Sequence, residues 1–317
     1  MRKHFIYLLF AAVLTLAPVA ALAAECTRMN TLFPKGEIEK TESGEFKRVG
    51  ENMSDRGYAE YLESKGSTAW PCMTAPLYFK GKEYPQDYKK SAEVFLGNDI
   101  RFCTPGFVYL GAMFKHGLGV AKDPARAKYW FRAHFAATPK PAENLEGMAK
   151  IIENIQSAAG VRIKTDFEAA LAWLEKTLEE PPVRLYERGL AYLKTGEAVA
   201  GFPIADAMLV RAARSGHERA ALTHARLYLD CKIGAYGRSP WFYLPRFAEA
   251  GHAEAAALLG LYYAENSEKR FSNYLDARDW LDKALAGDLP IGLWGKAEAA
   301  LAWVNALLEE KDRRRSQ

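Results

Sequence analysis

SGHERAALTHARLY, residues 215–228, is repeated as AGHAEAAALLGLYY at residues 250–263. The two copies share three aligned positions: Gly216 with Gly251, His217 with His252, and Tyr228 with Tyr263. Gly287 opens a third copy, so these glycines follow one another after 35 and 36 residues. Such a period suits two helices of about 12 residues joined by short turns. The chain is therefore expected to be a helical-repeat protein.

The first helix of each expected pair carries a small residue three positions before an aromatic one. The pairs are Gly111 with Phe114, Gly189 with Tyr192, Ala225 with Tyr228, and Gly260 with Tyr263. A small residue lets a neighbouring helix approach closely, and an aromatic ring one turn later fills the adjoining gap. We interpret these positions as packing positions of the repeat.

The segment LGAMFKHGLGVAKDPARAKYWFRA, residues 110–133, contains the expected end of one helix and the start of the next. Gly117 and Gly119 can adopt the left-handed conformation that ends helices. Asp123 is a favoured N-cap residue, and Pro124 follows at the first helical position. A phosphate-binding loop is the alternative, but the pattern has no Gly-Lys-Ser/Thr and no preceding strand. The segment is therefore interpreted as a turn inside the repeat.

The second helix of a pair is marked by an alanine three residues before an aromatic residue. The pairs are Ala92 with Phe95, Ala127 with Trp130, Ala170 with Trp173, and Ala277 with Trp280. Residues at this spacing share one helix face, so both members are expected to be buried. An exposed aromatic ladder that binds sugars is the alternative.

These residues resemble the Sel-one-like repeat family, bacterial relatives of tetratricopeptide repeats in which antiparallel helix pairs stack into a superhelix. The resemblance is best over residues 105–134. It implies an all-α fold, a right-handed superhelical solenoid of antiparallel helix pairs over residues 69–310. The expected units are 72–96, 103–137, 141–180, 182–215, 216–250 and 251–287, followed by a capping helix at 294–310.

Some parts of the chain depart from this pattern. Residues 24–68 match no unit and are expected to be an irregular extension, with Tyr58 and Tyr61 packed on the first unit. Pro245 falls inside the expected second helix of its unit, where proline would kink it. Residues 311–317 are expected to be a solvated basic tail.

The N-terminus has the features of an export signal. Arg2 and Lys3 precede an apolar run, and Ala21-Leu22-Ala23 provides a small-residue cleavage site. Residues 1–23 are therefore expected to be a signal peptide, which places the protein in the bacterial periplasm or outside the cell. An uncleaved membrane anchor is the alternative. Without the first two cations the chain has 41 basic and 39 acidic residues, a balance that gives no reason to expect a nucleic-acid partner.

Four cysteines follow the signal segment: Cys26, Cys72, Cys103 and Cys231. None forms a Cys-x-x-Cys pair, so structural disulfides are favoured over zinc or redox sites. Cys72 and Cys103 open the first helices of neighbouring units, which lie side by side in a stacked solenoid. They are therefore the preferred bridge. Pairing of Cys26 with either of them is the alternative, and Cys231 is expected to be free.

Possible catalytic patterns are incomplete. Lys194-Thr195-Gly196 matches one motif of penicillin-interacting serine enzymes, but the mature chain has no Ser-x-x-Lys to supply the nucleophile. His217-Glu218 begins like a zinc-protease motif, but Ala221 stands where the second histidine belongs. His116 and His134 are expected at the surface. We predict no catalytic residue, metal or cofactor.

The resemblance and the missing chemistry together suggest a module that binds another protein or peptide of the cell envelope in a helical groove. Secreted members of the family suggest a scaffold, a regulator or an immunity partner. The alternative is an envelope hydrolase or penicillin-binding enzyme of the cysteine-rich repeat type. The two classes differ in whether the protein captures a stoichiometric partner or is covalently labelled by penicillin.

Overall fold

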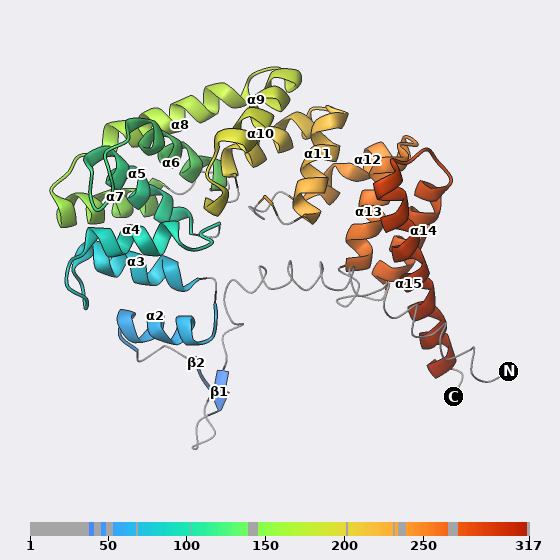
Figure 1. The fold of residues 1–317 in the computed structure, drawn as a ribbon, viewed down its shortest axis with the longest axis horizontal. Coiled ribbons are helices and arrows are strands. Elements are labelled where there is room, and N and C mark those ends of the chain that lie inside the picture. The colour runs from blue at the N-terminus through green and yellow to red at the C-terminus, as the bar shows by residue number, and fades with distance from the viewer. Residues whose placement is uncertain are drawn as a thin grey trace. The chain divides into compact units, whose positions relative to one another are not determined.

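The computed structural model describes residues 38–40, 46–48, 53–67, 69–101, 103–138, 145–200, 202–230, 232–233, 239–265 and 272–315 (Figure 1). These residues form two compact units. The N-terminal unit contains the described residues up to Ser215, with Lys232 and Ile233. The C-terminal unit contains those from Gly216 to Asp230 and from Ser239 onward. The division falls inside the interval 69–310 that was expected to be one solenoid.

The N-terminal unit is built mainly of helices. They are α2 (Asp55–Ser64), α3 (Trp70–Lys80), α4 (Tyr88–Leu96), α5 (Thr104–His116), α6 (Pro124–Ala137), α7 (Leu145–Ala159), α8 (Lys164–Leu178), α9 (Pro182–Thr195) and α10 (Pro203–Arg214), with a 3₁₀ turn at Ala198–Ala200. Consecutive helices pack in pairs, namely α3 on α4, α5 on α6 and α9 on α10. Helix α6 also packs on α8 and α10. The expected helix pairing is confirmed for these three pairs, whereas α7, the expected first helix of unit 141–180, packs mainly on α3 and α5.

Two short strands precede these helices. Strands β1 (Ile38–Lys40) and β2 (Phe46–Arg48) pair antiparallel, with Ile38 opposite Arg48. Together with α2, which contains Tyr58 and Tyr61 and packs on α3 of the first unit, they show that parts of the interval 24–68 have regular structure. Ser54 explains where α2 begins, because its hydroxyl accepts a hydrogen bond from the amide of Gly57.

The turn between α5 and α6 has the predicted chemistry. Gly117 and Gly119 have φ angles of 74° and 71°, which other residues rarely adopt. A carboxylate oxygen of Asp123 accepts hydrogen bonds from the amides of Ala125 and Arg126, both at 3.0 Å. The local sequence therefore predicts this turn, and close packing of Gly119 on the backbone of Tyr88 adds a tertiary constraint.

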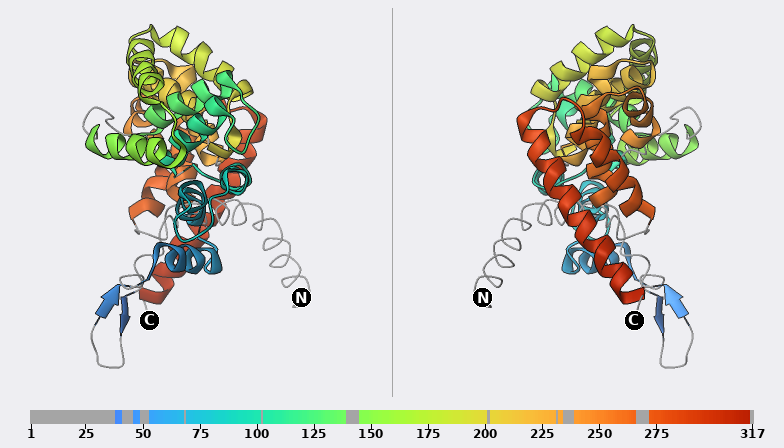
Figure 2. Two further views of the ribbon diagram at one scale, coloured as in Figure 1. Left: turned by 90° about the vertical axis from the view of Figure 1, so that its left-hand side faces the viewer. Right: turned by 90° about the vertical axis from the view of Figure 1, so that its right-hand side faces the viewer.

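The C-terminal unit contains α11 (Glu218–Leu229), a 3₁₀ turn (Pro240–Phe242), α12 (Leu244–Glu249), α13 (Ala253–Glu265), α14 (Ser272–Leu285) and α15 (Ile291–Arg315). Pro245 does not kink a longer helix as expected. It lies in the first turn of α12, where its missing amide costs nothing. Figure 2 shows α15 as one long helix that includes the predicted capping segment and most of the expected basic tail.

The small residues of the first helices lie where helices approach closely, as predicted. A Cβ atom added to Gly111 would be 2.6 Å from the Phe131 ring, and one added to Gly260 would be 2.5 Å from Leu281. At Gly189 the same addition would be 3.1 Å from Leu209. Of the partnering aromatic residues, Phe114 is buried, whereas Tyr192, Tyr228 and Tyr263 are only half-buried.

The aromatic residues of the second helices differ in burial. Trp130 and Phe95 are buried, as predicted. Trp173 and Trp280 are only half-buried, so the prediction that both are buried is wrong. In each case a cation covers part of the ring: Arg132 over Trp173 and Lys283 over Trp280. A long side chain with a charged end can cover an aromatic face that no neighbouring helix reaches.

No helix in the described part of the chain is both long and apolar enough to span a bilayer. The signal segment 1–23 and the cysteines Cys26 and Cys231 lie outside the described residues.

Candidate functional site

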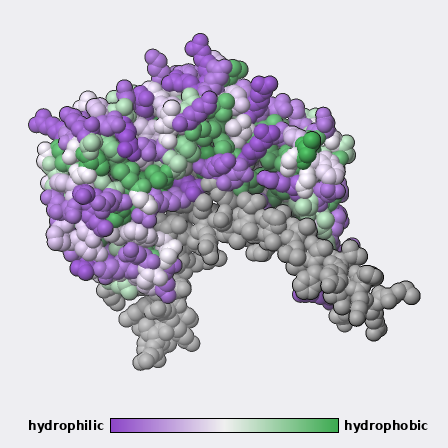
Figure 3. Space-filling view, viewed as in Figure 1, coloured by the Kyte–Doolittle hydropathy of each residue, from purple (hydrophilic) through white to green (hydrophobic). Residues whose placement is uncertain are grey.

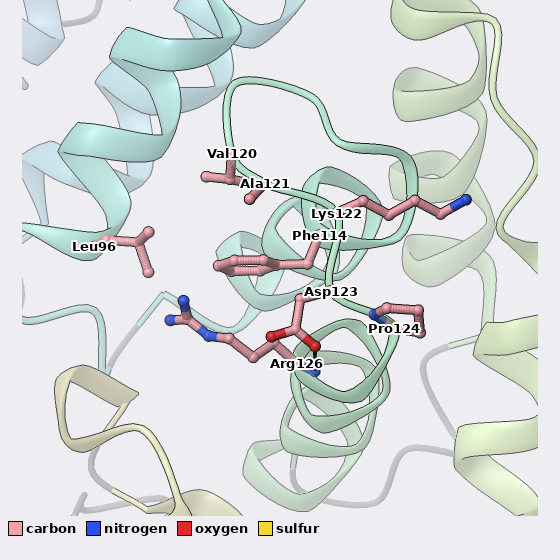
Figure 4. Close-up of a pocket in the computed structure, with 8 residues that line it drawn as sticks. All are labelled: Leu96, Phe114, Val120, Ala121, Lys122, Asp123, Pro124 and Arg126. Carbon is pink, nitrogen blue, oxygen red and sulfur yellow. Dashed lines mark hydrogen bonds between the residues drawn. The ribbon is translucent and has the colours of Figure 1, made fainter.

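Two adjoining cavities flank the turn between α5 and α6. The first has a volume of about 430 Å³ and is lined by this turn, Leu96 and the side chains of Phe114 and Arg126 (Figure 4). The second, about 450 Å³, lies between α6 and α8. Lys122 and Pro124 line both cavities. We call the second cavity the α6–α8 groove.

Two charged residues of the first cavity, Arg126 and Asp123, already have partners. The Nε atom of Arg126 lies 2.7 Å from a carboxylate oxygen of Glu197, and its guanidinium carbon lies 4.0 Å from the centre of the Phe114 ring. Asp123 is used as the cap of α6. Figure 4 shows Arg126 directed toward Phe114, whereas the side chain of Lys122 extends away from it.

The α6–α8 groove has an apolar floor. Ala127 and Phe131 of α6 and Ala170 of α8 lie buried at its base, and Ala169 of α8 is exposed. Phe131 is itself held by close packing on Gly111 of α5. The packing of three helices therefore shapes this floor.

An ion pair between α5 and α8 lines the groove. The ammonium group of Lys115 pairs with the carboxylate of Asp166 and lies 3.0 Å from the carbonyl oxygen of Arg162. A ring nitrogen of His116 lies 3.3 Å from the same carbonyl oxygen. Lys115 and Asp166 are 51 residues apart in the sequence, so only the fold brings them together.

The other cations of the groove have no acidic partner within the described ranges. Lys122 and Lys128 are exposed, and neither forms an ion pair there. Arg132 follows Lys128 by one helical turn, which places both on one face of α6. The face of the molecule in Figure 3 is largely hydrophilic, with hydrophobic patches between the polar side chains.

Arg132 contacts an aromatic ring and has no carboxylate partner among the described residues. Its guanidinium carbon lies 3.8 Å from the centre of the Trp173 ring, and its Nε atom is buried with no hydrogen-bond partner in the described part of the chain. Burial lowers the pKa of Arg132, a hydrogen bond with Tyr192 opposes that shift, and the positive charge of Arg188 adds to it. A partly desolvated cation of this kind favours an incoming anion.

The predicted disulfide is present. Cys72 in α3 and Cys103, the residue that precedes α5, are bonded, with their Cα atoms 5.4 Å apart. The bond therefore joins the first helices of neighbouring pairs, as predicted.

The repeated glycines have two different roles. Gly216 and Gly251 have φ angles of 95° and 92° and open the next helix, as expected of turn positions. Gly287 has no such angle, and a Cβ atom there would be 2.6 Å from the Cβ of Ala253. The third glycine of the series is therefore needed for close packing instead.

The histidines have structural roles, and His116 and His134 are more buried than predicted. His217 caps α11, because its Nδ1 accepts a hydrogen bond from the amide of Ala220 at 3.1 Å. His252 lies 2.9 Å from a carboxylate oxygen of Glu218. His116 is half-buried. His134 was expected at the surface, but it is 3% exposed, because it faces α5 and α8 and not solvent.

The incomplete catalytic patterns lie at helix ends. Gly196 ends α9, and the Thr195 hydroxyl donates a hydrogen bond to the carbonyl of Ala191 at 3.1 Å. No group of three metal-ligating side chains occurs among the residues whose positions are given.

His134 makes the N-terminal unit sensitive to acid. Burial between Phe135 and Phe167 lowers its pKa to about 4, although a hydrogen bond to the carbonyl of Thr104 acts in the opposite direction. The unfolded chain, with an ordinary pKa of about 6.5, binds the proton more readily. We therefore expect the free energy of unfolding to fall by about 3 kcal/mol between pH 6.5 and 4 and to be fully retained above that range.

Urea denaturation across this pH range measures the effect, with His134→Asn as the control. Asparagine keeps a donor for the carbonyl of Thr104 but does not titrate. The free energy of unfolding of this variant should therefore fall by about 3 kcal/mol less than that of the wild type between pH 6.5 and 4. A variant with the same pH dependence as the wild type would show that His134 is not responsible.

Sequence reasoning missed the groove cations. One local signal was available: Lys128 and Arg132 are like charges four residues apart on a helix, which repel unless something compensates them. No local signal pointed to Asp166, because its partner belongs to another helix pair.

Comparisons with known proteins find similar folds only. No protein-family model matches the chain, and no curated protein matches it. A solved structure described as c5321, a protective antigen of uropathogenic Escherichia coli with an SLR fold, is 19% identical, with a TM-score of 0.28. The alignment covers 74% of this chain and 56% of that one, so it spans only about half of the antigen.

A Sel1 repeat protein from Oxalobacter formigenes is 20% identical, with a TM-score of 0.26. That alignment covers 74% of this chain and 100% of the other. With such low TM-scores, the assignment of the fold depends on the helix pairs described above.

Proposed function

We propose that this protein is an exported bacterial interaction module that binds a partner protein of the cell envelope in the α6–α8 groove. The observation that carries the proposal is the groove itself: an apolar floor beside cations that have no acidic partner within the described ranges. Apolar surface with a few fixed polar groups is typical of binding sites. The helical-repeat scaffold supports the proposal, because stacked helix pairs commonly present such surfaces to proteins.

The groove can be tested by filling it. Ala169 is exposed and lines the groove, so Ala169→Trp should occupy the space without changing charge. We expect this variant to lose at least about tenfold in affinity for the partner captured by the wild type from envelope extract, a loss typical of an interface core. The measurement is quantitative capture followed by titration of the isolated partner.

Ala302→Trp is the matched control, since Ala302 is an exposed alanine of α15 and belongs to the other unit. Equal capture by Ala169→Trp and the wild type would place the binding site elsewhere. The identity of the partner then separates the three proposed roles: an assembly component favours a scaffold, a sensor domain favours a regulator, and a toxic effector favours an immunity protein.

Export is the second part of the proposal, supported by the basic start, the apolar run and the Ala-x-Ala site of residues 1–23. We expect the protein released by osmotic shock to begin just after Ala23 or Ala24, as measured by its intact mass. A cytoplasmic protein that retains Met1 would contradict this, and a membrane-bound one would favour the uncleaved anchor.

A further inference from the structure

We propose that the segment bound by the α6–α8 groove is acidic, with one carboxylate paired to Arg132 and an apolar neighbour that contacts Ala169. This inference depends on the proposed function, because it specifies which chemistry the partner protein presents. It rests on charge complementarity, on how Arg132 is held, and on the spacing of the cations along α6.

The charge of the groove is strongly unbalanced. Four permanent cations line it, namely Lys115, Lys122, Lys128 and Arg132, against the single carboxylate of Asp166. That carboxylate already pairs with Lys115. The remaining three cations face a shared cavity without an acidic partner inside the described ranges, although the whole chain has a net charge of only +4. Opposite charge on a partner would relieve this repulsion and steer its approach.

Arg132 is suited to be the anchor. The ring of Trp173 fixes its guanidinium group, and Trp173 in turn packs edge-on against Tyr192, with the ring centres 6.2 Å apart. A held side chain loses little freedom when it binds. Its nearest cationic neighbour at the same ring, Arg188, already pairs with Glu180. Of the two arginines at the Trp173 ring, Arg132 is therefore the one available to an external carboxylate. A guanidinium group can bind a carboxylate through two donors.

The spacing along α6 favours more than one acidic residue. Side chains one helical turn apart, such as Lys128 and Arg132, are separated by about 5–6 Å. Alternate side chains of an extended peptide are separated by about 6.6 Å. Two acidic residues at alternate positions can thus reach both cations.

The apolar floor argues against a simple polyanion. Pro124 and Ala169, the exposed apolar residues of the groove, would be covered without gain by a polymer that presents only charged or hydroxyl groups. A peptide can present an apolar side chain next to a carboxylate, which matches both features of the groove.

A display library of short random peptides tests the proposal without assuming a sequence. The mature wild-type chain is used for selection in parallel with Arg132→Gln and Lys128→Gln. We expect the clones that need the wild-type groove to be enriched in Asp and Glu beside apolar residues. Synthesised peptides from these clones should bind Arg132→Gln about tenfold or more weakly, the loss expected for a charge-assisted hydrogen bond.

Three controls keep the outcome clear. Lys176→Gln removes an exposed lysine of α8 that does not line the groove and should bind as the wild type. Lys128→Gln changes an exposed residue, so it tests the charge even if Arg132→Gln alters folding. Asp166→Asn removes the one acidic group of the groove and should strengthen binding several-fold.

The inference would be overturned if the peptides that bind the wild type but not the groove variants are neutral or basic. It would also be overturned if no peptide distinguishes the wild type from the groove variants. Binding of polyglutamate or an anionic polysaccharide as tight as that of the selected peptides would also overturn it. If Ala169→Trp still abolishes capture of the envelope partner in any of these cases, the proposed function survives and only the acidic specificity is wrong.

Discussion

Trp130→Ala should lower the free energy of unfolding by about 3–5 kcal/mol, because it removes the largest fully buried side chain of the described core. The Trp130 ring packs against Phe107 and Tyr129, with ring centres 5.5 and 5.4 Å away. The surrounding helices hold these rings in place, so the cavity left by removal of the indole cannot close easily. Urea denaturation followed by circular dichroism measures the loss.

Two variants control this experiment. Trp130→Phe keeps most of the packing and removes an indole N–H that is buried with no partner among the described residues, so it should cost far less. Trp280→Ala changes the equivalent residue of the last pair, which is half-buried beneath Lys283, and should cost less than Trp130→Ala because less apolar surface is lost from the interior. Similar losses for the two tryptophan-to-alanine variants would contradict the difference in burial.

Loss of the disulfide should lower the free energy of unfolding by about 3–4 kcal/mol, because the bond closes a loop with a sequence separation of 31 residues. The crosslink restricts the unfolded chain more than the folded one. The double variant Cys72→Ala/Cys103→Ala tests this, since alanine adds no buried polar group next to the apolar surroundings of Cys103.

Reduction of the wild type is the independent comparison. A reducing agent should destabilise the wild type by about the same amount and leave the double variant unchanged. Peptide mapping without reduction identifies the bond directly, and Cys103 linked to a cysteine other than Cys72 would contradict the structure.

The sequence determined the features that depend on neighbouring residues. Gly117, Asp123 and Pro124 fix the turn between α5 and α6, because left-handed backbone, capping and a proline start are properties of a few consecutive residues. Repetition then predicted helix pairs, and with them the bond between Cys72 and Cys103, because each pair buries its apolar face against the next.

The tertiary structure alone decided which of these similar positions are buried. Trp130 and Trp280 have the same spacing from alanine, but α6 packs on α5, α8 and α10, which leaves no water at Trp130. His134 is buried for the same reason. The groove likewise joins Lys115 of α5, Arg132 of α6 and Asp166 of α8, which no local pattern relates. Burial and charge pairing depend on the other helices that surround a residue, and those helices come from distant parts of the chain.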